Sequence, residues 1–208
     1  MRLLPCGESA ILVELDSTGE RDALHDWLHS ARPAAVASYV PAHRTVLVAV
    51  ATPALVPSVA DWLRARVLSD PPSRASEPSS ELVVEVAYDG ADLAEVAEHL
   101  GITAGEVVRR HTEQLWRVEF VGFKPGFGYL IGDTGGLHVP RRESPRSRIP
   151  RGAVALAGDY SGIYPSPSPG GWQLIGHTEQ VLFDPDATPA AQLTAGTTVR
   201  FVEAVARG

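Results

Sequence analysis

The pattern of apolar and polar residues over positions 1–70 predicts a small α+β unit. Apolar residues recur at helical spacing over residues 20–31 and again after Thr52-Pro53, which read as a helix N-cap followed by proline at the first helical position. Runs rich in β-branched and large apolar residues indicate strands at 9–16, 35–40 and 45–51, with a further candidate at 2–5. This order of elements favours helices that cover one face of a mostly antiparallel sheet.

A polar segment rich in proline and serine, residues 71–81, follows this unit. It has no hydrophobic periodicity, which is typical of a linker. The sequence therefore predicts an N-terminal α+β domain over residues 1–70 and a second domain over 82–208. The alternative is a long surface loop inside one domain.

The second domain is predicted to be mainly β, with two short helices inserted near its start. The helices are expected at 92–100, where Gly101 ends the helix, and from Thr103 to about Gln114, where Thr103 and Glu106 fit a capping box. The predicted strands lie at residues 81–88, 115–121, 181–183 and 199–202. This pattern favours a closed or nearly closed β-barrel.

The stretch from Gly122 to Gly176 has glycine or proline every few residues, with aromatic residues and arginines between them. Glycine allows positive φ, and proline fixes φ and removes a backbone donor. We therefore expect short strands joined by tight, rigid turns. Such turns suit either an anionic ligand or a fixed surface for another protein.

Composition narrows the class of protein. The chain has 208 residues, of which 44% are hydrophobic and 21% charged, and its formal net charge is −7. This balance is that of an ordinary globular protein and argues against an electrostatic nucleic-acid footprint. A single cysteine, Cys6, excludes an internal disulfide. The N-terminus does not resemble a signal peptide, and no apolar run is long enough to cross a bilayer. We expect a cytoplasmic protein.

Common enzyme motifs are missing from the sequence. Gly126-Phe127-Gly128 lacks the third glycine and the context of a dinucleotide site, and there is no Walker A sequence or G-x-S-x-G elbow. The seven histidines show no metal-binding spacing, so no metal site is predicted.

A cluster of arginines offers candidate anion ligands, because the guanidinium group binds carboxylate or phosphate in a bidentate manner. Arg141 and Arg146 each follow a proline and are the preferred candidates. The alternative is a solvated loop whose arginines pair with nearby acidic residues. The cluster comprises Arg141, Arg142, Arg146, Arg148 and Arg151.

Three other side chains near the same stretch carry useful chemistry. Lys124 lies in a sharp turn and is a candidate for binding an anionic group. His138 and His177 are candidates for proton transfer near neutral pH, and the alternative for each is a structural role.

Three segments resemble the allophanate hydrolase subunit 1 family, also called the KipI family, which includes the B-type subunit of 5-oxoprolinase. They are GFKPGFGYL (122–130), VPRRESPRSRIPRGAVALAG (139–158) and GIYPSPSPGGWQLIGHT (162–178), and the likeness extends upstream over 88–112. The sequence departs from the family at Tyr160, where glutamine is usual, and at His177, where arginine is usual. Gly126, Tyr160 and Gln173 lie in or beside these segments and complete the expected set of substrate- or phosphate-binding residues.

The resemblance implies an N-terminal α+β domain followed by a cyclophilin-like β-barrel. It implies partners of the allophanate hydrolase subunit 2 (KipA) type and the LamB/YcsF type. Together these subunits would form an ATP-dependent 5-oxoprolinase, an amidohydrolase that opens 5-oxoproline to L-glutamate. On this view ATP serves the whole complex and this chain is inactive alone.

Three alternatives differ in class. A KipI-like protein would inhibit a sensor histidine kinase, and a relative of urea amidolyase would act on an allophanate- or urea-type amide. The barrel by itself suggests a peptide-binding or prolyl-isomerase-like module, which is the weakest alternative because fold does not fix function.

Overall fold

The computed structural model describes residues 1–67 and 81–204, and the chain divides into two compact units, Met1–Glu77 and Pro78–Gly208. The expected linker lies outside the described residues except for Glu81. Among the described residues, no helix is long and apolar enough to cross a membrane.

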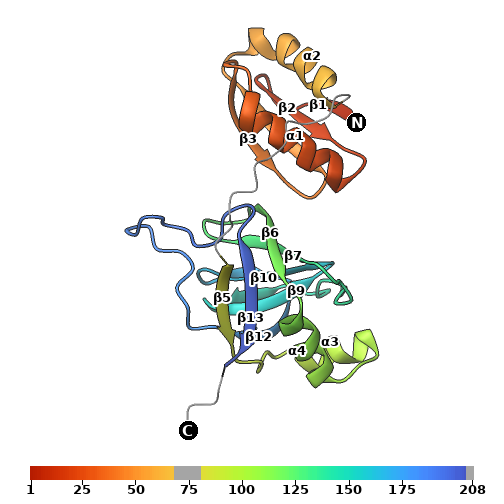
Figure 1. Cartoon of the computed structure of the whole chain (residues 1–208), viewed down its shortest axis with the longest axis vertical. Coiled ribbons are helices and arrows are strands. Elements are labelled where there is room, and N and C mark those ends of the chain that lie inside the picture. Colours follow the sequence, from red (N-terminus) through yellow and green to blue (C-terminus); the bar gives the residue numbers. More distant parts are fainter. Residues whose placement is uncertain (68–80, 205–208) are drawn as a thin grey trace. The chain divides into compact units, whose positions relative to one another are not determined.

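The N-terminal unit is a four-stranded antiparallel sheet with the order β1-β2-β4-β3. Helices α1 and α2 pack against each other and against the sheet, as Figure 1 shows, and enclose a core of buried aliphatic side chains. Its elements are β1 (Arg2–Pro5), β2 (Ala10–Glu14), α1 (Thr18–Ala31), β3 (Val36–Pro41), β4 (Thr45–Val50), the 3₁₀ helix η1 (Pro53–Leu55) and α2 (Val56–Val67). The predicted α+β unit is confirmed, including the candidate first strand.

Two details of the first unit differ from the sequence prediction. Helix α1 begins at Thr18 rather than at residue 20, because the Ser17 hydroxyl accepts a hydrogen bond from the Glu20 N–H and caps the helix. Thr52 occupies the expected N-cap, but its side chain makes no capping bond and the chain first forms a 3₁₀ turn.

The second unit is built on a seven-stranded sheet with the order β12-β9-β10-β7-β6-β13-β5. Only β13 and β5 are parallel, and a bridge between Ala87 and His177 links the chain just after β5 to β12, so the sheet is a nearly closed barrel. Its strands are β5 (Glu81–Val86), β6 (Trp116–Val121), β7 (Gly128–Gly132), β9 (Ala153–Ala157), β10 (Tyr160–Ile163), β12 (Gln173–His177) and β13 (Thr198–Glu203). The predicted α+β class with a barrel is confirmed.

A short ribbon and two helices complete the second unit. Strands β8 (Arg146–Ile149) and β11 (Ser168–Gly170) form a separate antiparallel pair. Helices α3 (Leu93–Leu100) and α4 (Ala104–Glu113) lie side by side at one end of the barrel (Figure 1). Gly101 has a φ of 67° and ends α3, as predicted. The strand predicted at 181–183 is wrong, because Phe183 makes only an isolated bridge to Ala191.

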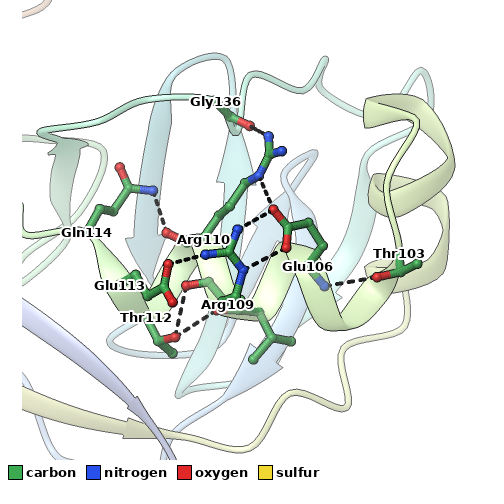
Figure 2. A network of polar contacts seen from close by, with 9 residues as sticks. Thr103, Glu106, Arg109, Arg110, Thr112, Glu113, Gln114 and Gly136 are labelled. Carbon is green, nitrogen blue, oxygen red and sulfur yellow. Dashed lines mark hydrogen bonds and ion pairs between the residues drawn. The ribbon is translucent and has the colours of Figure 1, made fainter.

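The start of α4 forms half of the predicted capping box. The Thr103 hydroxyl accepts a hydrogen bond from the Glu106 N–H at 3.1 Å. The Glu106 carboxylate instead accepts hydrogen bonds from Arg109 and Arg110 (Figure 2). These bonds, with that from Arg109 the larger, lower the pKa of Glu106 to about 2.

Replacing Thr103 with alanine is expected to lower the free energy of unfolding by about 1 kcal/mol, because the N–H of Glu106 loses its acceptor. Urea denaturation of the two proteins measures this difference. Thr103→Ser keeps the hydroxyl and serves as the matched control. A serine variant as unstable as the alanine variant would contradict a capping role.

A buried polar chain crosses the interior of the barrel unit. His111 on α4 is fully buried, with Nδ1 2.7 Å from the Tyr88 hydroxyl and Nε2 2.8 Å from the Ser161 hydroxyl. Burial lowers the pKa of His111 to about 3, so the ring is neutral near pH 7. With no access for a substrate, this Ser–His–Tyr chain holds α4 against β10.

Candidate functional site

Six aromatic residues of the barrel unit form a connected cluster, called here the aromatic face. Tyr129 on β7 lies at its centre, stacked on Phe120 with ring centroids 4.3 Å apart and edge-on to Tyr160 and Trp172 at 5.7 and 5.5 Å. The members are Phe120, Phe127, Tyr129, Tyr160, Tyr164 and Trp172. Most of them belong to or pack against a hydrophobic cluster separate from the main barrel core, and only Tyr129 and Tyr160 are partly exposed.

Two tyrosine hydroxyls of this face, those of Tyr129 and Tyr164, stay protonated at neutral pH. Burial raises the pKa of Tyr164 to about 12, although a hydrogen bond from the Trp172 backbone and the charge of Arg141 act against the rise. Burial also raises the pKa of Tyr129, and Arg141 again opposes it. Tyr164 is buried, whereas Tyr129 is partly exposed, so the Tyr129 hydroxyl is the one of the two that can donate a hydrogen bond to a bound ligand.

Tyr160 is tied to an acidic residue on a neighbouring part of the sheet. Its hydroxyl donates a hydrogen bond to Oε2 of Glu119. Glu119 lies in β6 at a register shift between Val118 and Phe120, where β6 has one residue more than β7. The bulge allows a carboxylate and an aromatic ring from adjacent residues to reach the same region.

Asp92, just before α3, anchors two arginines of the basic cluster. Arg146 makes a bidentate contact with its carboxylate at 2.7 and 2.8 Å, and Arg142 donates to Oδ1 at 2.8 Å. The Leu174 N–H donates to Oδ2 at 2.7 Å. Asp92 is 3% exposed, so these four bonds form a buried clamp that joins α3, β8 and β12.

The clamp changes the interpretation of the arginine cluster. Arg146 is a preferred anion ligand on sequence grounds, but its guanidinium group donates to the Asp92 carboxylate. The guanidinium group of Arg142 also donates to Asp92, and the backbone N–H of Arg142 donates to the Gly171 carbonyl at 2.8 Å. These bonds fix the backbone on the C-terminal side of Arg141.

Arg141 has a different environment from its two neighbours. It is exposed, and the described part of the chain gives it no hydrogen bond or ion pair. Its charge nonetheless acts on Tyr129 and Tyr164. Arg141 is therefore a cation with free donors, held beside the aromatic face on a fixed backbone.

Lys124 lies in the turn between β6 and β7. Its ammonium donates to the carbonyls of Ser166 and Pro167, both at 3.2 Å. An ammonium group has three donors, so one N–H remains for a ligand. Gly126, two residues later, has a φ of 80°, and a Cβ there would lie 2.4 Å from that of Phe183. Gly126 thus shapes the turn through its backbone.

Gln173 supports the segment that carries Arg141. It is 4% exposed and donates from Nε2 to the Pro140 carbonyl at 3.4 Å. It also lines a shallow cavity of about 180 Å³ between α3 and residues 139–140.

The two candidate catalytic histidines are separated in space. His138 lies 2.8 Å from Asp159 and His177 lies 2.8 Å from Asp89, and both pairs are exposed. His177 pairs with Ala153, the first residue of β9. His138 precedes Val139, which forms a bridge to Gly158, just past the last residue of β9. The length of β9 keeps them roughly 13 Å or more apart. At this separation the two histidines cannot act together in one proton transfer.

Sequence reasoning missed Asp92 and Glu119 as parts of the site. Asp92 looked like an ordinary residue at a helix start, and its arginine partners lie 50 and 54 residues away. Glu119 looked like a polar residue on the outside of a strand. No local sequence pattern predicts the contacts of Asp92 with the arginines or of Glu119 with Tyr160.

Comparison with known proteins gives the family. A model described as the carboxyltransferase domain, subdomain C and D, matches residues 1–193. The B-type subunit of 5-oxoprolinase from Escherichia coli O157:H7 is 46% identical over 134 residues, covering 62% of each chain. Its counterpart from Haemophilus influenzae is 45% identical over 113 residues, covering 54% of this chain and 53% of that protein. These matches span about half to three fifths of the relatives' length.

Solved structures agree with the fold. The crystal structure of TTHA0988 has a TM-score of 0.76 and 32% identity, covering 94% of this chain and 39% of that chain. The conserved uncharacterized protein PH0987 from Pyrococcus horikoshii has a TM-score of 0.59 and 30% identity, covering 99% of both chains.

A more distant structure, the K. lactis urea amidolyase, shares the fold with a TM-score of 0.73 and 16% identity, covering 98% of this chain and 15% of that chain. The family model spans nearly the whole chain, and the resemblance carried by the three motif segments is confirmed. The chain belongs to the carboxyltransferase-domain family, subdomain C and D, which is the family of the B-type 5-oxoprolinase subunits.

Proposed function

We propose that this chain is a subunit of an ATP-dependent 5-oxoprolinase that opens 5-oxoproline to L-glutamate. The observation that carries the proposal is the identity of 45–46% to three proteins named as the B-type subunit of 5-oxoprolinase. The geometry of the aromatic face supports it, because 5-oxoproline is a small, nearly flat lactam with one carboxylate.

The chain's own residues would bind and orient this ligand. The lactam ring rests on Tyr129 and Tyr160, the partly exposed members of the aromatic face, and the free guanidinium of Arg141 pairs with the ligand carboxylate. The remaining N–H of Lys124 offers a second contact to the anion. The neutral hydroxyl of Tyr129 supplies a donor for the amide oxygen.

The fit to ATP is poor within the described part of the chain. Opening a lactam near neutral pH needs coupling, which ATP hydrolysis supplies. A triphosphate needs several cationic or N–H donors, whereas Asp92 occupies Arg142 and Arg146. Arg141 and one N–H of Lys124 suit a single carboxylate or phosphate. The proposal therefore places ATP with residues of a partner subunit.

The proposal also requires partners. Subunits of the allophanate hydrolase subunit 2 (KipA) type and the LamB/YcsF type would complete the complex, and this chain alone would not turn over the lactam. In support, the region matched here covers only 39% of TTHA0988, so this fold also occurs inside a longer chain.

Co-expression with the two cognate subunits tests the proposal, with glutamate formed from 5-oxoproline as the readout. We expect glutamate that depends on ATP and disappears when this chain is omitted. A stable complex that makes no glutamate would reject 5-oxoproline and favour an allophanate- or urea-type amide. No complex, with loss of histidine-kinase autophosphorylation on titration, would favour a KipI-like inhibitor.

A further inference from the structure

The turn between β6 and β7 has an unusual backbone at Phe123. The Lys124 N–H donates to the Gly122 carbonyl at 2.7 Å, which closes a three-residue γ-turn with Phe123 at its centre. Phe123 has a φ of 67° and is the only residue other than glycine with a positive φ among residues 1–67 and 81–204. A γ-turn with positive φ at its centre is rare and strained, above all for a bulky side chain.

The neighbouring contacts impose this conformation on Phe123. The Gly122 N–H donates to the Phe127 carbonyl at 3.2 Å, and the Phe127 N–H donates to the Lys124 carbonyl at 3.1 Å. Gly126 packs directly on Phe183. Glycine would adopt the backbone of Phe123 without strain. The phenylalanine therefore makes the turn harder to form.

Folding gains little from the side chain in return. The Phe123 side chain is 58% exposed, more than any other large hydrophobic residue in the described part of the chain. It touches the aromatic face edge-on, with centroids 5.4 Å from Phe127 and 6.3 Å from Tyr164. Strain that persists at an exposed side chain is typical of a functional position.

We propose that Phe123 is a substrate-contacting specificity residue, the outer wall of the aromatic face, which packs on the flat surface of a planar amide or lactam. The proposal rests on the proposed function and names the residue that recognises the ring. Phe123 extends the aromatic face at Phe127 and Tyr164, and it adjoins Lys124. A planar ligand held by Arg141 through its anionic group would meet this ring.

The variant Phe123→Gly in the assembled complex tests the proposal. We expect the KM for 5-oxoproline to rise roughly five- to tenfold with kcat within about twofold, because an aromatic contact to the bound ring is lost. The melting temperature of the chain should stay the same or rise, since the strain is removed. Phe123→Tyr should keep the wild-type KM. Val83→Ala, at an exposed apolar position on β5, is the control for the loss of an exposed apolar side chain elsewhere in the chain.

Two results would overturn the assignment: an unchanged KM in Phe123→Gly, or a clear fall in its melting temperature. An unchanged KM together with weaker binding of the partner subunits would make Phe123 an interface residue. If the wild-type complex forms no glutamate, the proposed function fails, and calorimetry with 5-oxoproline, succinimide and hydantoin decides the role of Phe123. Weaker binding of any of these planar amides to Phe123→Gly than to wild type supports the role, and equal or absent binding rejects it.

Discussion

Replacing Asp92 with alanine is expected to lower the free energy of unfolding of the barrel unit by about 2–4 kcal/mol, because Arg146 and one buried N–H lose their acceptors and Arg142 keeps only a 3.6 Å ion pair with the exposed Glu95. The melting temperature should fall by on the order of 10 °C. Calorimetry or thermal denaturation of the purified chain measures this change. Asp92→Asn keeps the shape but not the charge, and we expect an intermediate loss.

Asp89→Ala provides a matched control only three residues away. Asp89 also contacts a residue of β12, His177, but this pair is exposed. Exposed pairs contribute roughly 0–1 kcal/mol, so this variant should melt close to wild type. Equal losses in the two variants would contradict a special role for the buried clamp.

The pH dependence of stability follows from the same clamp. Burial alone would raise the pKa of Asp92, but the hydrogen bonds from Arg146 and Leu174 and the charges of both arginines outweigh it and hold the pKa below 3.8. A carboxylate with a depressed pKa in the folded state stabilises the fold fully above its unfolded pKa. The contribution should be lost as the pH falls below about 3.8 through the folded value, and Asp92→Asn should weaken this acid sensitivity.

Local sequence patterns predicted the elements of the fold well. The strand pattern of the first unit and the helix that ends at Gly101 depend on residues close together in the chain, and both are confirmed. The strand predicted at 181–183 is wrong, because the segment is a loop in which Leu182 is buried, Val181 is exposed and Phe183 packs against Gly126. A short apolar run does not distinguish the two cases.

The site itself depended on contacts that no local pattern contains. The prolines before Arg141 and Arg146 indicated a fixed backbone at both arginines. They do not indicate which of the two guanidinium groups pairs with a carboxylate. That depends on Asp92, which the fold brings close from 54 residues before Arg146. The strand pattern favoured a barrel and the likeness to a family agreed with it, but the closure itself joins segments far apart in the chain.

The difference between the two arginines leads to the largest expected effect on activity. Arg141→Ala in the assembled complex should raise the KM for 5-oxoproline by about 100-fold, which corresponds to roughly 2.7 kcal/mol and is the loss expected for a charge-assisted bidentate contact. Stability should be unchanged, because the described part of the chain gives Arg141 no hydrogen bond or ion pair. Steady-state kinetics and thermal denaturation measure the two quantities on the same samples.

Two further variants separate this role from general electrostatics. Arg141→Lys keeps the charge but not the planar fork, so we expect it to recover only part of the affinity. Arg151→Ala removes another exposed arginine of the same cluster, and its KM should stay within about twofold of wild type because it loses only a solvent-screened charge. A similar rise in KM for Arg141→Ala and Arg151→Ala would show that the patch acts only through its net charge. A normal KM in Arg141→Ala would remove the carboxylate contact from the proposed site and leave the aromatic face to bind the lactam without it.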